Sequence, residues 1–175
     1  MDMKTVFLFG HRDCPTFVSE GIFDAAEDYI KQFPGEDIRF IVGHRGDFDL
    51  VATYMLIVVK KMYTQVTLQK LIAYYDPIKH LYYPDEIDGT IFPEGLETVP
   101  KPFAIVKANN IMVNSCDAVI CYVLRKGSNT YKLLRKAQRR GIPIVNLAET
   151  FPPDMKITPE WAKFCEELAA EKENS

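Results

Sequence analysis

The feature that most constrains the fold is an alternation between short apolar runs and longer amphipathic stretches along the chain. The apolar runs are typical of strands and occur at 5–9, 38–42, 66–73, 118–123 and 142–147. Helical periodicity marks 17–33, 47–61, 102–114 and 130–140, with a last stretch at 158–172. Strands joined by connections of helix length run in the same direction, with right-handed crossovers. We therefore expect an α/β domain with a mostly parallel sheet of about five strands and helices on both faces.

Such a domain is a three-layer Rossmann-like fold, and it accounts for residues 1–148. Residues 149–175 are expected to form a C-terminal extension with one helix. The segment 74–101 interrupts the pattern with tyrosines and prolines, and it is too aromatic to stay solvated, so we expect an ordered excursion. Asp47 is expected near the start of the second helix, as its N-cap.

Composition limits the classes of function. The 175 residues carry a net charge of −3 with a pI near 5.7, which argues against nucleic acid as the main partner. No apolar run approaches the ~20 residues that cross a bilayer, and the start lacks a signal peptide, so a cytoplasmic location is expected. The four cysteines include no CxxC pair and are interpreted as reduced thiols, so neither a metal nor a cofactor is predicted.

Three polar loops follow predicted strands, where ligands bind in parallel sheets. They are residues 10–13, 43–49 and 126–130, and the last two open helices. Glycines allow a phosphate to approach the main chain, and helix N-termini attract anions. We expect a phosphate on the amides of Gly43 to Asp47 and of Gly127 to Thr130.

Several of these features have a simpler interpretation. Gly10 and Gly43 could merely turn the chain after strands. His11 and His44 could form a metal or acid–base pair, but hydrogen bonds to ligand or backbone are favoured. The basic side chains of the helix at 130–140 are favoured to form a solvated face over a nucleic-acid patch. The tyrosines after residue 73 could stack on a base but more often pack an extended loop.

Longer motifs carry a resemblance to a known family. They are GHR at 10–12, VGHRGDFD at 42–49, TIFPEGLETVPKPFAI at 90–105, NNIMVNSCDAVICYV at 109–123, GSNT at 127–130 and GIPIVNL at 141–147. Over about residues 4–147 the chain resembles the bacterial and phage branch of the SLOG superfamily. That superfamily is similar to the LOG (lysine-decarboxylase-like) phosphoribohydrolases and to the Rossmann core of DNA-processing protein A.

The resemblance implies binding of a nucleotide or nucleotide-derived ligand, often by a homodimer. LOG enzymes carry a Glu and an Arg that support cleavage of the N-glycosidic bond, and here those positions hold Leu133 and Ala108. No catalytic residue is therefore assigned. The predicted ligand-binding residues are Gly10, His11, Arg12, Gly43, His44, Arg45, Gly46, Asp47, Glu94, Asn109, Gly127, Ser128, Asn129 and Thr130.

Three functions follow from the sequence. The first is a binding or sensor domain for a nucleotide-derived small molecule. The second is a nucleotide N-glycosidase or phosphoribohydrolase that uses a different carboxylate, for which Glu94 and Asp47 are candidates. The third is a nucleic-acid-associated protein, which the acidic net charge makes the weakest of the three.

Overall fold

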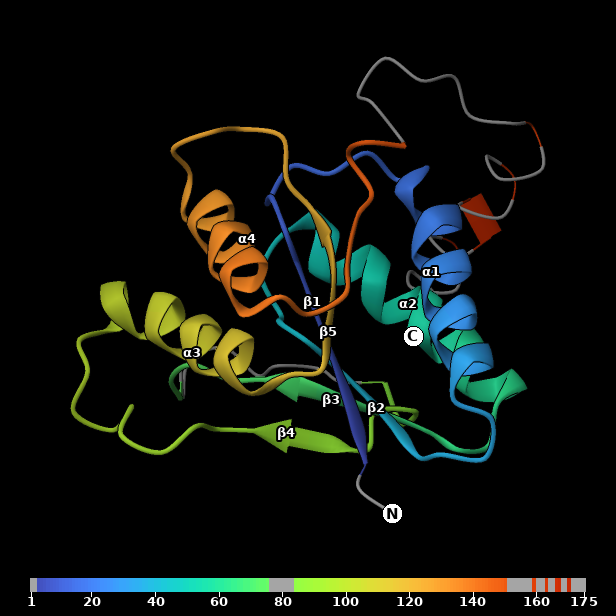
Figure 1. The fold of residues 1–175 in the computed structure, drawn as a ribbon, viewed down its shortest axis with the longest axis horizontal. Helices are drawn as coiled ribbons and strands as arrows, with labels where there is room; N and C mark the ends of the chain where they lie inside the picture. Colours follow the sequence, from blue (N-terminus) through green and yellow to red (C-terminus); the bar gives the residue numbers. More distant parts are fainter. Residues whose placement is uncertain are drawn as a thin grey trace.

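The computed structural model describes residues 3–75 and 84–150, with five single positions (159, 163, 166, 167 and 170) beyond them. These residues form one sheet of six strands in the order β4-β3-β2-β1-β5-β6, and every neighbouring pair is parallel. Helices cover both faces of the sheet (Figure 1). The Rossmann-like α/β fold predicted from the sequence is confirmed, with six strands in place of about five.

The predicted elements occur with small shifts at their ends. The strands are β1 (Lys4–Gly10), β2 (Ile38–Val42), β3 (Val66–Leu71), β5 (Ala118–Tyr122) and β6 (Ile144–Asn146). The helices are α1 (Val18–Gln32), α2 (Asp47–Met62), α3 (Lys101–Ser115) and α4 (Asn129–Arg140). The helix expected at 158–172 lies largely outside the described residues, and the domain boundary near 148 stays a prediction.

One strand, β4 (Gly89–Ile91), lies in the segment 74–101, for which we expected an ordered excursion but no strand. It pairs with β3 through three residues only, and none of them is buried. Side chains hold it at the sheet edge: Asp88 accepts a hydrogen bond from the Leu68 amide at 2.8 Å and another from Lys60 at 2.6 Å. A strand so short and polar leaves no periodic signal in the sequence.

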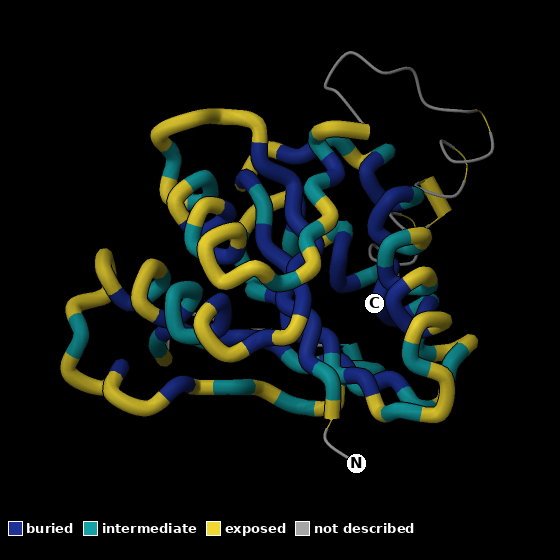
Figure 2. The backbone as a smooth tube through the Cα atoms, in the orientation of Figure 1, coloured by how far each residue is buried: buried dark blue, intermediate teal, exposed yellow. Residues whose placement is uncertain are grey.

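Strand β1 shows how the sheet divides the core into two layers. Val6 and Leu8 pack with α1 and α2 on one face, and Phe7 and Phe9 pack with α3 and α4 on the other. Successive side chains of a strand point to opposite faces, so an apolar run serves both layers. Figure 2 shows the result: the central strands are buried, and the outer sides of the helices are exposed.

The order of the strands creates a crevice at the end of β1. From β1 the chain moves to β2 on one side, and it later returns to β5 on the other. In parallel sheets, ligands bind where this change of direction separates the loops. Gly10 ends β1 at this point, and its backbone lies so close to the buried Phe48 of α2 that an added Cβ would stand 2.4 Å from the ring.

Replacing Gly10 with Ala should destabilise the protein by about 1–3 kcal/mol, the usual cost of overpacking. The physical cause is overlap with the Phe48 ring, since a φ in the left-handed region is absent at this glycine. Urea unfolding measures the loss. The double variant with Phe48→Leu should lose less than the two single changes added together, and strict additivity would contradict the proposed overlap.

Candidate functional site

A cavity of about 650 Å³ lies at the carboxyl ends of the central strands. Its walls come from the loops after β1, β2 and β5, from the end of β3, and from α3 and α4. Its volume is in the range of ordinary small-molecule sites. The crevice predicted from the strand order is therefore a real opening in the structure.

The structure brings most of the predicted site residues together in this cavity. Those in its lining are Gly10, His11, Arg12, Gly43, His44, Arg45, Asn109, Ser128, Asn129 and Thr130. Gly46, Asp47, Glu94 and Gly127 are absent from the lining. Glu94 is exposed in a loop beside α3, where Lys107 donates to the neighbouring Gly95 carbonyl at 3.2 Å. That any of these residues binds a ligand stays a prediction.

The lining is strongly basic, although the whole protein is acidic. Its charged side chains are Arg12, Arg45, Arg125, Lys132, Lys136 and Arg139, against the two carboxylates Asp13 and Asp49. In a concave surface, like charges add to one field, which attracts anions. The sequence singled out Arg12 and Arg45 but did not assign the cations of α4 to the site.

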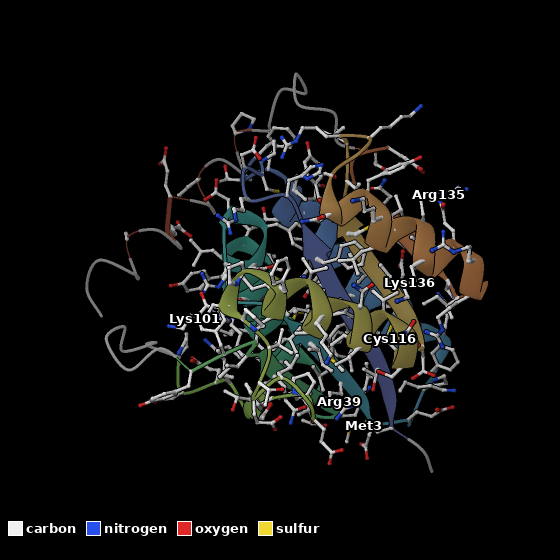
Figure 3. All side chains as sticks on the ribbon, turned by 90° about the vertical axis from the view of Figure 1, so that its left-hand side faces the viewer. Met3, Arg39, Lys101, Cys116, Arg135 and Lys136 are labelled. Atoms are coloured by element: carbon white, nitrogen blue, oxygen red, sulfur yellow. The ribbon has the colours of Figure 1, made fainter. Side chains whose placement is uncertain are left out.

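The basic residues of α4 divide into two groups. Lys132, Lys136 and Arg139 line the cavity. Lys136, labelled on α4 in Figure 3, also donates to Asn110 of α3 at 3.0 Å. Arg140 instead donates to the carbonyls of Val113 in α3 and of Cys116 just after it, both at 2.7 Å, and the exposed Arg135 contacts Gln138. Four of these five side chains are exposed and Lys136 is half-buried, so the solvated face favoured from the sequence fits the structure, and three of its cations also border the cavity.

The turn between β2 and α2 differs from the expected phosphate loop. The Arg45 amide donates to the Asp49 carboxylate at 2.9 Å, and the Asp47 amide donates to the Arg12 carbonyl at 2.7 Å. Gly46, with φ of 93°, is the N-cap of α2 in place of Asp47. Because two of its amides already have acceptors and a carboxylate stands beside them, this turn is a poor phosphate site.

A buried lysine lies beneath that turn. Lys70 of β3 is 5% exposed and donates to the Gly43 carbonyl at 2.7 Å and to the Thr53 hydroxyl. Burial lowers the pKa of Lys70 to about 8 and raises the pKa of Asp49 to about 6, while their mutual attraction opposes both shifts. The sequence signal that we missed is a lysine inside the strand VTLQKL.

The loop from Arg125 to α4 is better suited to an anion. The Ser128 side chain caps α4 by accepting a hydrogen bond from the Tyr131 amide at 3.1 Å, and it donates to the Arg125 carbonyl at 2.8 Å. The amides of Asn129 and Thr130, in the first turn, have no acceptor within the helix. The positive end of the helix dipole adds to their attraction for a negative group.

The histidines and Tyr74 make internal contacts. His44 donates from Nδ1 to the Leu71 carbonyl at 3.0 Å, and both ring nitrogens of His11 are hydrogen-bonded. Among the described residues, no group of three or more His, Cys, Asp or Glu side chains is arranged to hold a metal ion. The Arg45 guanidinium lies 4.6 Å from the centre of the Tyr74 ring, so this tyrosine packs on a cation; Tyr82 and Tyr83 are outside the described residues.

The cavity holds few groups suited to hydrolysis. Leu133 and Ala108, at the positions where LOG enzymes carry Glu and Arg, both line it and are both buried. Of its two carboxylates, Asp13 pairs with Arg125 at 2.8 and 2.9 Å, and Asp49 accepts from the Arg45 amide. Each carboxylate is thus already engaged within the protein.

Fold and cavity together define a Rossmann-like protein with a basic crevice, and comparisons with known proteins agree on the fold. DNA processing protein A (DprA) from Streptococcus pneumoniae has a TM-score of 0.58 at 15% identity, over 97% of this chain and 56% of that one. DprA from Helicobacter pylori has a TM-score of 0.51 at 12% identity, over 96% and 81%. The structural genomics target TM1055 has a TM-score of 0.50 at 11% identity, over 81% and 72%.

These likenesses confirm, at the level of the fold, the expected resemblance to the Rossmann core of DNA-processing protein A. The chain spans little more than half the length of the Streptococcus pneumoniae protein that it matches. No family model and no curated protein sequence matches the chain. In the part of the chain that the structure describes, no helix has the length and apolar character needed to span a bilayer.

Replacing Lys70 with Met should make stability more dependent on pH. Loss of the ammonium raises the pKa of Asp49 further above about 6. A carboxyl whose folded pKa lies above its unfolded value stabilises at low pH, and this contribution is lost as pH rises through the folded pKa, at up to ~1.4 kcal/mol per pH unit. Urea unfolding between pH 5 and 7.5 should therefore show a steeper loss than in the unmodified protein.

The control is the double variant Lys70→Met with Asp49→Asn, in which the added pH dependence should disappear. Equal pH slopes for the Lys70→Met variant and the unmodified protein would show that the two groups are not coupled.

Proposed function

We propose that this protein binds a nucleotide or another phosphate-bearing small molecule in the cavity at the carboxyl ends of the strands. The observation that carries the proposal is the joint presence of six cationic side chains and the first turn of α4 in one opening of about 650 Å³. Ligands of Rossmann-like sheets bind at this edge, and phosphates bind at helix N-termini.

The phosphate is assigned to the α4 end of the cavity. Asn129 and Thr130 supply amides there, and Lys132 is on the same helix. The turn after β2 is less suited to this role because its amides at Arg45 and Asp47 already donate within the protein. This revises the expectation that both loops hold phosphate.

The rest of the ligand faces a less polar wall. Leu71 and Ala73 at the end of β3, with Ile105 and Val106 of α3, line this part, and Asn109 adds a polar group. Small-molecule sites commonly combine such apolar area with a few polar groups that set orientation. A nucleoside linked to a phosphate has both kinds of surface.

Binding or sensing is favoured over cleavage of an N-glycosidic bond. Such cleavage requires a carboxyl group that can act on the sugar or on water. Both cavity carboxylates are engaged, Asp13 by Arg125 and Asp49 by the Arg45 amide, and Glu94 is absent from the lining.

The test is a thermal-shift screen with 5′-nucleoside monophosphates, followed by titration calorimetry of the hits. A ligand at ~100 times its Kd should stabilise by roughly 2.7 kcal/mol, which raises Tm by roughly 5–10 °C. The variant Asn129→Asp should abolish the shift, because it places a carboxylate where the phosphate binds. Its own stability should be kept, since acidic residues favour a helix N-terminus.

The matched control is Gln138→Glu, which makes the same change of charge on an exposed part of α4 that does not line the cavity. It should keep the ligand-induced shift. Equal shifts in the Asn129→Asp variant and the unmodified protein would exclude α4 as the phosphate site.

A second candidate is binding of single-stranded nucleic acid. Lys132, Lys136 and Arg139 form a line of cations in the cavity that spans about 10 Å of helix, longer than one phosphate requires. The Helicobacter pylori protein with a similar fold is described by its single-stranded DNA binding mode. Against this candidate stands the net charge of −3.

Fluorescence anisotropy with a labelled oligothymidylate tests it. Three phosphate contacts predict that log K falls with log salt at a slope of roughly −2, and Lys132→Gln should make the slope shallower by about 0.7. Arg135→Gln, on the exposed side of the same helix, should leave the slope unchanged. Binding of mononucleotides without measurable binding of the oligonucleotide in low salt would eliminate this candidate.

A further inference from the structure

His11, in the loop after β1, is buried to 3% exposure and uses both ring nitrogens. Its Nε2 accepts hydrogen bonds from the amides of Leu124 and Arg125 at 2.8 and 3.1 Å. Its Nδ1 lies 2.9 Å from the Thr130 hydroxyl. One side chain therefore contacts both the start and the end of the loop that leads into α4.

These partners define the protonation state of the ring. An amide can only donate, so the nitrogen that receives two amides carries no proton. The proton of the neutral ring then resides on Nδ1 and is donated to Thr130. In the doubly protonated imidazolium both ring nitrogens are donors, so Nε2 can no longer accept the two amide hydrogen bonds.

The electrostatic surroundings favour the same neutral state. Burial, and next the charge of Arg125, lower the pKa of His11 below its ordinary value of 6.5, and Asp13 opposes them in part. Asp13 and Tyr122, which lie near the ring, keep their charge between pH 5 and 8, because the pKa of Asp13 is about 2 and that of Tyr122 is raised. Asp49, elsewhere in the cavity lining, has a pKa of about 6, and its protonation on acidification would strengthen anion binding, which is opposite to the effect expected of His11. His44, the cavity's second imidazole, bonds elsewhere, to Leu71.

The loop that His11 holds is the one assigned to the phosphate. It runs from Leu124 through the Ser128 cap to Thr130, whose amide belongs to the first turn of α4. The ion pair of Asp13 with Arg125 is a second tie on this loop, but its side chains are exposed. Among these contacts, those of His11 are the buried ones.

We propose that His11 is a positioning residue: as a neutral imidazole it holds the loop at 124–130 in its anion-binding form, and protonation of the ring releases the loop and weakens anion binding. This regulation rests on the proposed function of the same site. It also reverses the usual expectation for a histidine near a phosphate, where protonation adds a positive charge and strengthens binding.

The first experiment needs no ligand. Nitrogen-15 NMR of the histidine rings should show His11 as the Nδ1–H tautomer at pH 7.5, with a pKa below 6.5. The amide signals of Leu124 and Arg125 should change together as His11 titrates. An Nε2–H tautomer, an imidazolium at pH 7.5, or amide signals that ignore the titration would overturn the role of His11 as a loop tie, whatever the protein binds.

The second experiment follows inorganic sulfate, whose charge is constant from pH 5 to 8, through the amide signals of Asn129 and Thr130. Sulfate affinity should fall on acidification, approaching tenfold per pH unit below the pKa of His11. His11→Phe should bind sulfate weakly with no such slope, and His44→Gln should keep the slope. Affinity that stays level or rises on acidification in the unmodified protein would refute the inference and leave the proposed function standing.

A lack of sulfate and nucleotide binding at pH 7.5 would instead refute the proposed function and the regulation that depends on it. The tautomer and the two amide signals would still report whether His11 holds the loop. The two failures are therefore distinguishable.

Discussion

The central position of β1 in a fully parallel sheet is the constraint on which the rest of the structure depends. β2 and β5 both pair with it, and the ladder continues past its last residue, where the His11 amide donates to the Tyr122 carbonyl at 3.2 Å. At its other end, the Thr5 amide donates to the Asp117 carboxylate at 2.7 Å. The loop after β1 therefore leaves the sheet beside the loop after β5, and each can organise the other.

Charge is distributed unevenly over this frame. The chain is acidic overall, yet cations gather in the cavity lining, and the buried Lys70 supports the neighbouring turn from below. The two turns at the cavity have opposite character. The turn after β2 is closed by its own Asp49 carboxylate, whereas the one before α4 has only the Ser128 hydroxyl as a cap. On one side of the cavity the backbone amides are hydrogen-bonded within the protein, and on the other side is the N-terminus of α4, to which the proposed function assigns the phosphate.

The sequence was a good guide to this fold where burial creates a pattern, and a poor one elsewhere. Strands such as Ala118–Tyr122 are buried throughout and are apolar for that reason, so their position was predictable. β4 was missed because contacts of Asp88 and Lys60 hold it, and these leave no periodicity. The strand-end rule located the loops of the cavity. It could not reveal that the Asp47 amide was already used or that His11 reaches across 113 residues to Leu124, since such contacts depend on the packed chain.

The cations of α4 also affect which substitutions the sequence can accept during evolution. Lys132 and Lys136 stand four residues apart on one helix face, and like charges at that spacing weaken a helix. A neutral substitution of Lys132 relieves this repulsion, and under the proposed function it also weakens binding of the anion, whereas one of Lys136 would in addition lose the hydrogen bond to Asn110. Under the proposed function, a lineage that no longer needed the ligand would be expected to lose the charge at Lys132 before any change in the sheet beneath it.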